Sequence, residues 1–555
     1  MTDNLLNKTC SILLISCVGA LAYFNSFHCA FHFDDGAYII NDPAIRNIQD
    51  LQRIWGICPS RFVTFFTLAL NYHFHKLHVF GYHVVNLAFH LATALLVWWL
   101  TLLTFSTPSM KENEISKHGD FIALFAGLIF VSHPVQVEAV TYIWQRAASI
   151  AAFFYLASLC FYVRSRLSRD DRSASGIYYY FSFITAVAAM FSKENAVTLP
   201  LMVILYEFFF FGPPKRVVDK YAFSFLPLLS IIPLTVLLAK SGRFQAVYDM
   251  SAGSDTISPW HYFLTQLRVL VTYVRLDFLP FNQNFDYDYP VFKSIFELPV
   301  FSGFMFLIAV ICFAVHLFSK YRIVSFAIFW FLLTLLPESS FLPLKDVIFE
   351  HRLYLPLAGY SIFLASGAYY LWGKNNIYGL LMALSLIIAC YAFLTFQRNK
   401  VWRDEITLFN DTVQKSPHKA RPYSSLGVAY IDQGNFTRAL FDLNKVIAID
   451  PSFRHAYFNR GAFYEMQGDL ARAISDYDQA IKINPMDAEA YFNRGNIYNK
   501  QNDPARAVSD YSRAIEANPR YGKAYLNRGI TYRRLGDITK ALADLGHAKA
   551  IIQDE

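Results

Sequence analysis

Charged residues are scarce in this chain. Asp, Glu, Lys and Arg make up 16% of the 555 residues, whereas hydrophobic residues make up 55%. A water-soluble protein of this length cannot cover so much apolar surface, so lipid must solvate part of the chain. The net charge of +7 lies in short basic clusters between apolar runs, and this distribution argues against nucleic-acid binding.

Cysteine is also scarce, with seven residues and no C-x-x-C pair. This spacing excludes the common structural metal sites, and no bound metal or other cofactor is expected. Cys29 and Cys58 fall in one predicted external loop and would be able to pair in an oxidising compartment. Unpaired cysteines that behave as small hydrophobic residues are the expected state.

Long apolar runs are abundant. The first, at 11–27, is too long for a cleaved signal peptide and is read as a membrane span. About eleven runs of roughly span length predict a polytopic helical bundle: 11–27, 83–105, 120–132, 139–163, 177–191, 196–211, 221–240, 299–318, 323–337, 354–372 and 377–397.

The connections between these runs alternate in charge. Every second connection is basic, and the positive-inside rule places those connections in the cytoplasm. With an odd number of spans, the tail after about residue 398 then lies outside. The same outer side receives a first loop at 28–82 and a loop at 241–298, whose amphipathic stretch 261–279 is expected to lie along the interface.

From residue 420 the sequence repeats every 34 residues. Glycine, tyrosine, alanine and proline recur in register, which is the pattern of paired helices in a tetratricopeptide (TPR) solenoid. The predicted domains are a transmembrane domain at 1–397, a linker or partial repeat at 398–419, and four repeats at 420–453, 454–487, 488–521 and 522–555.

Three repeats carry asparagine at their sixth position, which faces the concave groove in TPR proteins: Asn459, Asn493 and Asn527, with Ser425 in the first repeat. An asparagine side chain donates and accepts hydrogen bonds at once, so this ladder predicts a groove that grips a peptide backbone. The alternative is that these asparagines are solvated residues of a consensus helix start.

Ionisable residues gather at the predicted outer ends of the spans. An ionisable group at membrane depth costs free energy, so its presence there calls for a structural or functional explanation. They lie in four segments, at 34–35, 133–149, 193–195 and 338–352. In the second, Pro134 is expected to open one helix that places Glu138, Tyr142, Gln145 and Ser149 on a single face. A single such residue would be explained as a helix cap. Acids and bases together on one side favour displacement of a phosphate leaving group.

These segments resemble the transmembrane-and-TPR (TMTC) proteins. The resemblance rests on the acidic pair Asp34 and Asp35, HPVQVEAVTYIWQRA at 133–147, SKENAVTLPL at 192–201, EHRLYLP at 350–356, NKVWRDEITLF at 399–409 and the repeats, in that order. It implies an all-α GT-C glycosyltransferase fold. The implied donor is a polyprenyl- or dolichyl-phosphate sugar, typically mannose, and the implied acceptor is a protein Ser or Thr hydroxyl.

The resemblance also implies roles for single residues. Asp34 or Asp35 would be the base of an inverting displacement. Other motif positions would bind the donor phosphate or the sugar: His133, Glu138, Arg146, Lys193, Glu194, His351 and Arg352. Four repeats are fewer than eukaryotic relatives usually carry, so two locations stay open. One is a bacterial inner membrane with periplasmic repeats, and the other is an ER membrane with lumenal repeats.

Two rival functions remain open at the level of sequence. A non-enzymatic membrane scaffold or receptor would use the TPR array alone, and an isolated 398–555 fragment would then restore its function. An oligosaccharide ligase or polymerase also combines many spans with TPRs. Such enzymes rely on a large late external loop, which is modest here.

Overall fold

The computed structural model describes residues 8–212, 225–231, 257–344 and 346–554, and in these ranges it contains helices and no strands. The all-α prediction is therefore confirmed for the described residues. The chain divides into two compact units. The bundle unit comprises Met1–Phe285 and Tyr289–Asp404, and the repeat unit comprises Asp286–Asp288 and Glu405–Glu555.

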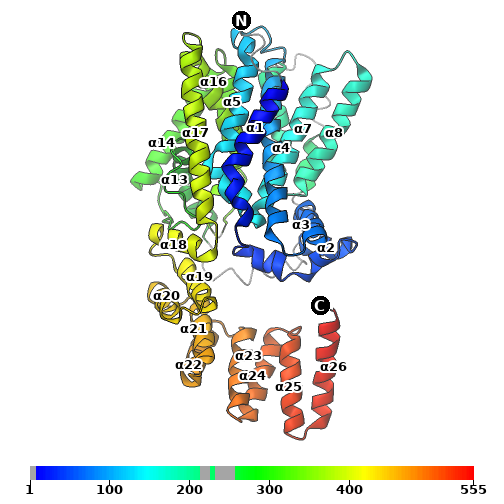
Figure 1. The fold of residues 1–555 in the computed structure, drawn as a ribbon, viewed down its shortest axis with the longest axis vertical. Coiled ribbons are helices and arrows are strands. Elements are labelled where there is room, and N and C mark those ends of the chain that lie inside the picture. The colour runs from blue at the N-terminus through cyan, green and yellow to red at the C-terminus, as the bar shows by residue number, and fades with distance from the viewer. Residues whose placement is uncertain (1–7, 213–224, 232–256, 345, 555) are drawn as a thin grey trace. The chain divides into compact units, whose positions relative to one another are not determined.

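The bundle unit is built from long helices that run side by side (Figure 1). They are α1 (Lys8–Tyr23), α4 (Val79–Phe105), α5 (Gly119–Ser132), α7 (Arg146–Leu167), α8 (Arg172–Met190), α9 (Leu199–Phe210), α13 (Pro259–Phe278), α14 (Leu298–Leu317), α15 (Arg322–Leu335), α16 (Pro356–Ala368) and α17 (Ile377–Val401). The first loop adds two shorter helices, α2 (Leu51–Ile57) and α3 (Phe62–His75).

Six helical segments of the described chain are long and apolar enough to cross a membrane: Lys8–His28, Val79–Phe105, Glu114–Ser132, Ile143–Leu167, Leu298–Leu317 and Ile377–Val401. A shorter apolar helix spans Arg322–Leu335. These helices identify a membrane protein. The remaining predicted runs are shorter or less apolar helices, and 221–240 lies largely outside the described residues, so the count of eleven spans stays a prediction.

Close helix contacts in the bundle depend on glycine. A Cβ on Gly127 of α5 would lie 2.7 Å from Ile15 of α1 and 3.2 Å from Trp98 of α4. A Cβ on Gly359 of α16 would lie 2.7 Å from the carbonyl oxygen of Ala327 in α15. Small residues let membrane helices approach this closely, so van der Waals packing replaces the hydrophobic driving force that water would provide.

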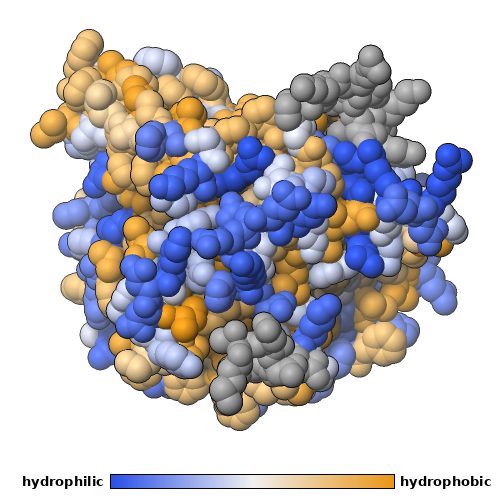
Figure 2. All heavy atoms as spheres, turned by 90° about the horizontal axis from the view of Figure 1, so that it is seen from above, coloured by the Kyte–Doolittle hydropathy of each residue, from blue (hydrophilic) through white to orange (hydrophobic). Residues whose placement is uncertain are grey.

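The bundle has two ends of different chemistry. The basic end carries the loops 106–118, 168–171, 318–321 and 374–376, and hydrophilic side chains spread over its centre (Figure 2). The opposite end, called the site end below, carries 29–78, 133–145, 191–198 and 336–355 (Figure 1). The four polar segments singled out in the sequence therefore share one end.

Helix α13 packs against α14, as Leu264 and Leu267 form a buried cluster with Val300. A Cβ on Gly303 of α14 would lie only 2.4 Å from the carbonyl oxygen of Leu267. The predicted position of this amphipathic helix along a membrane interface stays a prediction.

The repeat unit is a series of antiparallel helix pairs: α19 (Ala420–Asp432) with α20 (Phe436–Ile449), α21 (Arg454–Met466) with α22 (Leu470–Ile483), α23 (Ala488–Lys500) with α24 (Pro504–Ala517), and α25 (Gly522–Arg534) with α26 (Ile538–Asp554). These are the predicted TPR pairs. Helix α18 (Glu405–Lys415) packs on α19 as the second helix of each repeat packs on the next pair.

An arginine–aspartate ladder joins the two helices of repeats two to four. Arg460, Arg494 and Arg528 each bind both carboxylate oxygens of the aspartate sixteen positions later, at 2.7–2.8 Å. The first repeat lacks this contact because Leu426 occupies the arginine position. No hydrogen bond or ion pair to its aspartate, Asp442, is found within the described residues, although Asp442 is 6% exposed.

Asp442→Asn is expected to stabilise the first repeat at neutral pH. Burial raises the pKa of Asp442 to about 6, against the charge of Arg438. The folded state then holds a proton that the unfolded state releases near pH 4, so stability falls as pH rises from about 4 to 6. At pH 7.5, amide exchange of α20 should slow on the order of fivefold, or about 1 kcal/mol. At pH 4.5, between the pKa values of the unfolded and folded states, the difference should be smaller. An equal effect at both pH values would contradict the prediction.

Candidate functional site

The acidic pair lies in a turn directly after the first span. The backbone N–H of His32 donates to Asp35 Oδ2 at 2.9 Å, and the backbone N–H of Trp144 donates to Asp35 Oδ1 at 2.7 Å. Phe33, which lies between His32 and Asp35 in the sequence, has a φ of 44°, a conformation that is strained for a bulky residue. Both oxygens of the fully buried Asp35 carboxylate thus hold backbone in place.

The predicted single helix after Pro134 is wrong. The segment breaks into short helical turns at Pro134–Gln136, Val137–Thr141 and Ile143–Gln145, and α7 begins only at Arg146. Tyr142 has extended backbone, with ψ of 111°, so the N–H of Trp144 is not used within the helix. The Asp35 carboxylate accepts this N–H, which satisfies a buried donor through a partner from a distant segment.

Asp34 is the accessible member of the pair. Its side chain is half-buried, and its carboxylate lies in hydrogen-bond contact with the Tyr142 hydroxyl, which also accepts the Asp34 N–H at 3.0 Å. Tyr38 lies beside it. Burial and the charge of Asp34 raise the pKa of Tyr38 to about 12, against the opposing charge of Arg61. The Asp34 carboxylate and the Arg61 guanidinium therefore both act on the hydroxyl of Tyr38.

The two aspartates should respond differently to amidation. Asp35→Asn replaces an acceptor oxygen by an NH2 group that faces a backbone N–H, which leaves buried donors unsatisfied at a cost of about 1–3 kcal/mol. We expect a clear fall in the thermal midpoint of the detergent-solubilised protein, measured by fluorescence. Asp34→Asn should melt as the wild type does. Equal midpoints for the two variants would contradict this assignment.

Glu138 and His351 form a buried pair. Glu138 Oε1 lies 2.7 Å from His351 Nδ1, and Glu138 Oε2 accepts the backbone N–H groups of Glu350 and His351 at 2.9 and 3.1 Å. Glu138 is 2% exposed and His351 is 7% exposed. Burial raises the pKa of Glu138 to about 8 even though these two donors oppose it.

Three cations gather at the same end. Lys193 Nζ lies 3.1 Å from Glu338 Oε1, and Arg352 donates to the carbonyl oxygen of Asp346 at 2.7 Å. Arg61 binds Glu194 through two nitrogens at 3.0–3.2 Å. The charges of Lys193, Arg352 and Arg61 all act on His351.

Arg61 and Tyr38 were missed from the sequence. Tyr38 stacks on Trp144 with ring centroids 4.2 Å apart, and the Arg61 guanidinium lies 6.0 Å from the Trp144 ring. Both residues come from the first loop, at positions with no charge pairing or periodicity to mark them. Glu194 was predicted as a site residue, but its contact with Arg61 is formed only in the folded chain and leaves no signal in the sequence.

Two further predicted site residues, His133 and Arg146, bind backbone and side-chain groups of the bundle, and their roles stay predictions. His133 Nε2 lies 2.8 Å from the carbonyl oxygen of Asp277. The Arg146 guanidinium donates to the Asn86 side chain and to the carbonyl oxygens of Tyr82 and Thr67. Neither contact reaches the Glu138–His351 pair, and each residue ties loops or helices of the bundle together.

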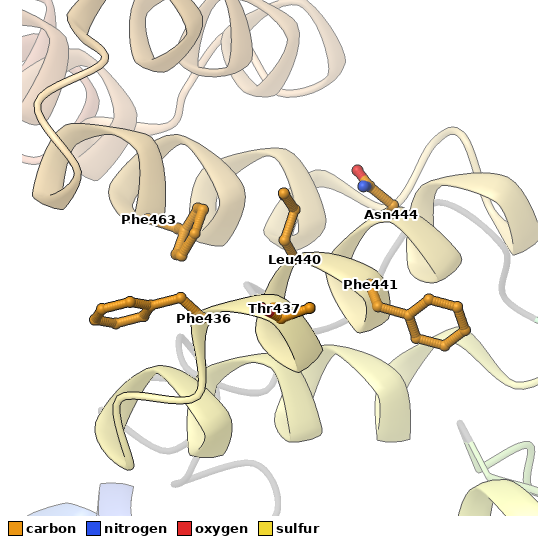
Figure 3. A pocket seen from close by; sticks show the side chains of 6 residues that line it. All are labelled: Phe436, Thr437, Leu440, Phe441, Asn444 and Phe463. Atoms are coloured by element: carbon orange, nitrogen blue, oxygen red, sulfur yellow. The ribbon is translucent and has the colours of Figure 1, made fainter.

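The asparagines of the repeat unit are half-exposed and partly engaged. Asn459 donates to Ser424 at 3.2 Å, Asn527 donates to Asn496 at 2.8 Å, and Asn493 bonds the Tyr477 hydroxyl. Each amide keeps capacity for a further hydrogen bond, so the peptide ladder stays a prediction. A separate apolar pocket is lined by Phe436, Thr437, Leu440, Phe441, Asn444 and Phe463 (Figure 3).

Cys29 and Cys58 are both buried and are not bonded to each other. Cys58 instead lies 3.3 Å from the Ser60 hydroxyl, and Cys29 contacts the carbonyl oxygen of Asn399. Within the described residues, no three histidine, cysteine or acidic side chains are placed to hold a metal ion.

Comparison with protein families places TPR repeats at 427–468 and 466–502 and tetratricopeptide repeats at 488–521 and 511–543. Among solved structures, a crystal structure of MamA is 24% identical and covers 27% of this chain and 87% of its own, with a TM-score of 0.25.

Curated relatives match most of the chain. The protein O-mannosyl-transferase Tmtc3 of Drosophila melanogaster is 26% identical over 525 residues, which is 80% of this chain and 55% of the fly protein. Human TMTC3, also named a protein O-mannosyl-transferase, is 26% identical over 77% of this chain and 50% of its own length. The chain thus spans about half the length of these relatives. In its apolar helical bundle followed by TPR pairs, the chain is similar to the TMTC proteins.

Proposed function

We propose that the protein is an integral-membrane glycosyltransferase that moves a sugar, mannose-like, from a polyprenyl- or dolichyl-phosphate donor to a Ser or Thr hydroxyl of a protein. The observation that carries the proposal is the set of charges at the site end. A half-exposed carboxylate, Asp34, and three buried or half-buried cations come from separate segments to one end of the bundle. The names of the relatives support the same reaction.

In the proposed reaction, Asp34 accepts the proton of the acceptor hydroxyl as its oxygen attacks the anomeric carbon. The bond between that carbon and the phosphate oxygen breaks, and the electron pair leaves with the lipid phosphate. Lys193 and Arg352 offset the charge that grows on the phosphate, and their low exposure keeps this interaction strong. No metal ion enters the proposed reaction.

Asp34 is favoured over Asp35 as the base because of accessibility. A general base must come within about 3 Å of the proton that it takes. Asp35 is fully buried, and both of its oxygens accept backbone N–H groups. We assign Asp35 a positioning role, because it fixes the turn that presents Asp34.

We further propose that the site end faces the periplasm or the ER lumen and that the repeats recruit the acceptor. The basic loops at the opposite end favour a cytoplasmic position for that end. Helix α17 ends at Val401 on the site end, and the repeat unit continues the chain from Glu405. The half-exposed asparagines offer amide contacts to an extended acceptor peptide.

The test is a cell-free transfer assay with purified protein, an acceptor protein extract and a panel of radiolabelled polyprenyl-phosphate sugars. Transfer of label to protein, lost on mild base elimination, supports the proposal. Absence of transfer with every donor, together with full rescue of a deletion strain by 398–555 alone, would replace it with the scaffold function.

A further inference from the structure

The Glu138 carboxylate fixes both the backbone and the ring of His351. Its Oε2 accepts the N–H groups of Glu350 and His351, and its Oε1 lies 2.7 Å from His351 Nδ1. The neighbouring Glu350 carboxylate is occupied elsewhere, since it accepts from Gln283 and from the Asn284 N–H. The ring of His351 also stacks on Phe349, with centroids 5.0 Å apart.

This arrangement decides which His351 nitrogen is available. Because Nδ1 is turned to Glu138, Nε2 lies on the opposite edge of the ring. The charged groups that act on the pair come from separate segments: Arg61, Lys193, Glu338 and Arg352 on His351, and Arg352 and Arg398 on Glu138. Four of these five groups are cations, of which Arg61 and Lys193 also bind Glu194 and Glu338. Cations beside the pair favour an anion as the ligand.

A proton lies between Oε1 and Nδ1, and the number of protons that the pair holds sets the chemistry of Nε2. When Glu138 is protonated, its O–H donates to Nδ1, and the neutral imidazole then carries its hydrogen on Nε2. When Glu138 is ionised, Nδ1 carries the hydrogen and Nε2 is an acceptor, which repels a phosphate oxygen. Burial favours the protonated form of Glu138 at neutral pH, because it raises the pKa of this carboxyl group.

We propose that the Glu138–His351 pair is a hydrogen-bond donor to the phosphate of the lipid substrate. Protonated Glu138 acts as a positioning residue that keeps the hydrogen on His351 Nε2. The inference rests on the proposed lipid-phosphate donor. It adds a proton switch, in which loss of one proton from the pair turns Nε2 from donor to acceptor and weakens phosphate binding. No covalent bond to the substrate changes in this step.

Glu138→Gln separates this role from a merely structural one. The glutamine carbonyl oxygen can accept the two backbone N–H groups, and its NH2 can donate to Nδ1, so the variant imitates protonated Glu138 at every pH. Wild-type affinity should fall about tenfold between pH 7 and 9, a window above the last ionisation of a phosphate monoester. The glutamine variant should keep neutral-pH affinity throughout.

The experiment measures binding of farnesyl phosphate to the detergent-solubilised full chain by titration calorimetry between pH 6.5 and 9. Glu114→Gln at the basic end is the matched control and should follow the wild type. His351→Asn should bind weakly at every pH. A flat wild-type profile, or the same fall in Glu138→Gln, overturns the proton switch while leaving the donor assignment standing. No binding at any pH overturns the lipid-phosphate donor itself.

Discussion

Replacing Asp34 by asparagine is expected to lower the rate of sugar transfer about 10²–10⁴-fold, which is the usual contribution of a general base. The amide cannot take the acceptor proton, yet it can keep the contact with the Tyr142 hydroxyl. Binding of the lipid phosphate should not change, because the proposed phosphate contacts come from Lys193, Arg352 and His351. The loss should therefore appear in kcat and leave the affinity for the donor intact.

The measurement is initial-rate transfer of radiolabelled sugar by purified wild type and variant, with the thermal midpoint recorded for each. Asp120→Asn, an exposed residue of the basic end, is the matched control and should transfer at the wild-type rate. Wild-type transfer by Asp34→Asn, or an equal loss in Asp120→Asn, would contradict the assignment of Asp34 as the base.

The repeats could be predicted in full register because their signals are local. Gly461 and Gly495 recur at 34 residues, and a Cβ on either would lie 2.9–3.0 Å from Tyr477 or Tyr511, so each close helix crossing leaves its own mark in the sequence. The gathering of polar segments at one end of the bundle was also predictable, because it follows from alternating helix direction and loop charge alone.

The unequal burial of Asp34 and Asp35 could not be predicted. Adjacent residues of one type have the same local pattern, and only the partner distinguishes them. Asp35 is buried because the chain breaks at Tyr142 and releases the Trp144 N–H, an event more than a hundred positions away in sequence. Helical periodicity predicted an unbroken helix there, since it takes no account of a distant carboxylate that stabilises the break.

Arg61 is a second residue whose place at the site could not be predicted from the sequence. A single arginine beside the apolar start of α3 gives no pattern, whereas its bidentate contact with Glu194 makes it part of the site. Burial raises the pKa of Glu194, but the adjacent Arg61 charge more than offsets this and lowers it to about 2. Pairing across segments, which no sequence window contains, decides the charge state of the site.

Arg494→Leu is expected to destabilise the third repeat by about 3 kcal/mol, because breaking a buried ion pair leaves the partner charge uncompensated. Arg494 binds both oxygens of Asp510 at 2.8 Å and reaches Asp478 of the preceding repeat. Asp510 is only 5% exposed, so water cannot replace the guanidinium. Since repeats stabilise their neighbours, the loss should extend into the second repeat.

Amide exchange of α22, α23 and α24 in the full chain provides the measurement, and opening should increase on the order of a hundredfold, the equivalent of that free energy. Arg513→Leu is the control, because its pair with Glu516 is 63% exposed on both sides and should contribute under about 1 kcal/mol. Adding Asp510→Asn to Arg494→Leu should recover part of the loss by removing the buried charge. Similar exchange in both single variants would mean that the ladder contributes no more than a surface pair. The first repeat, which has Leu426 at the arginine position, would then not be expected to be less stable than the others.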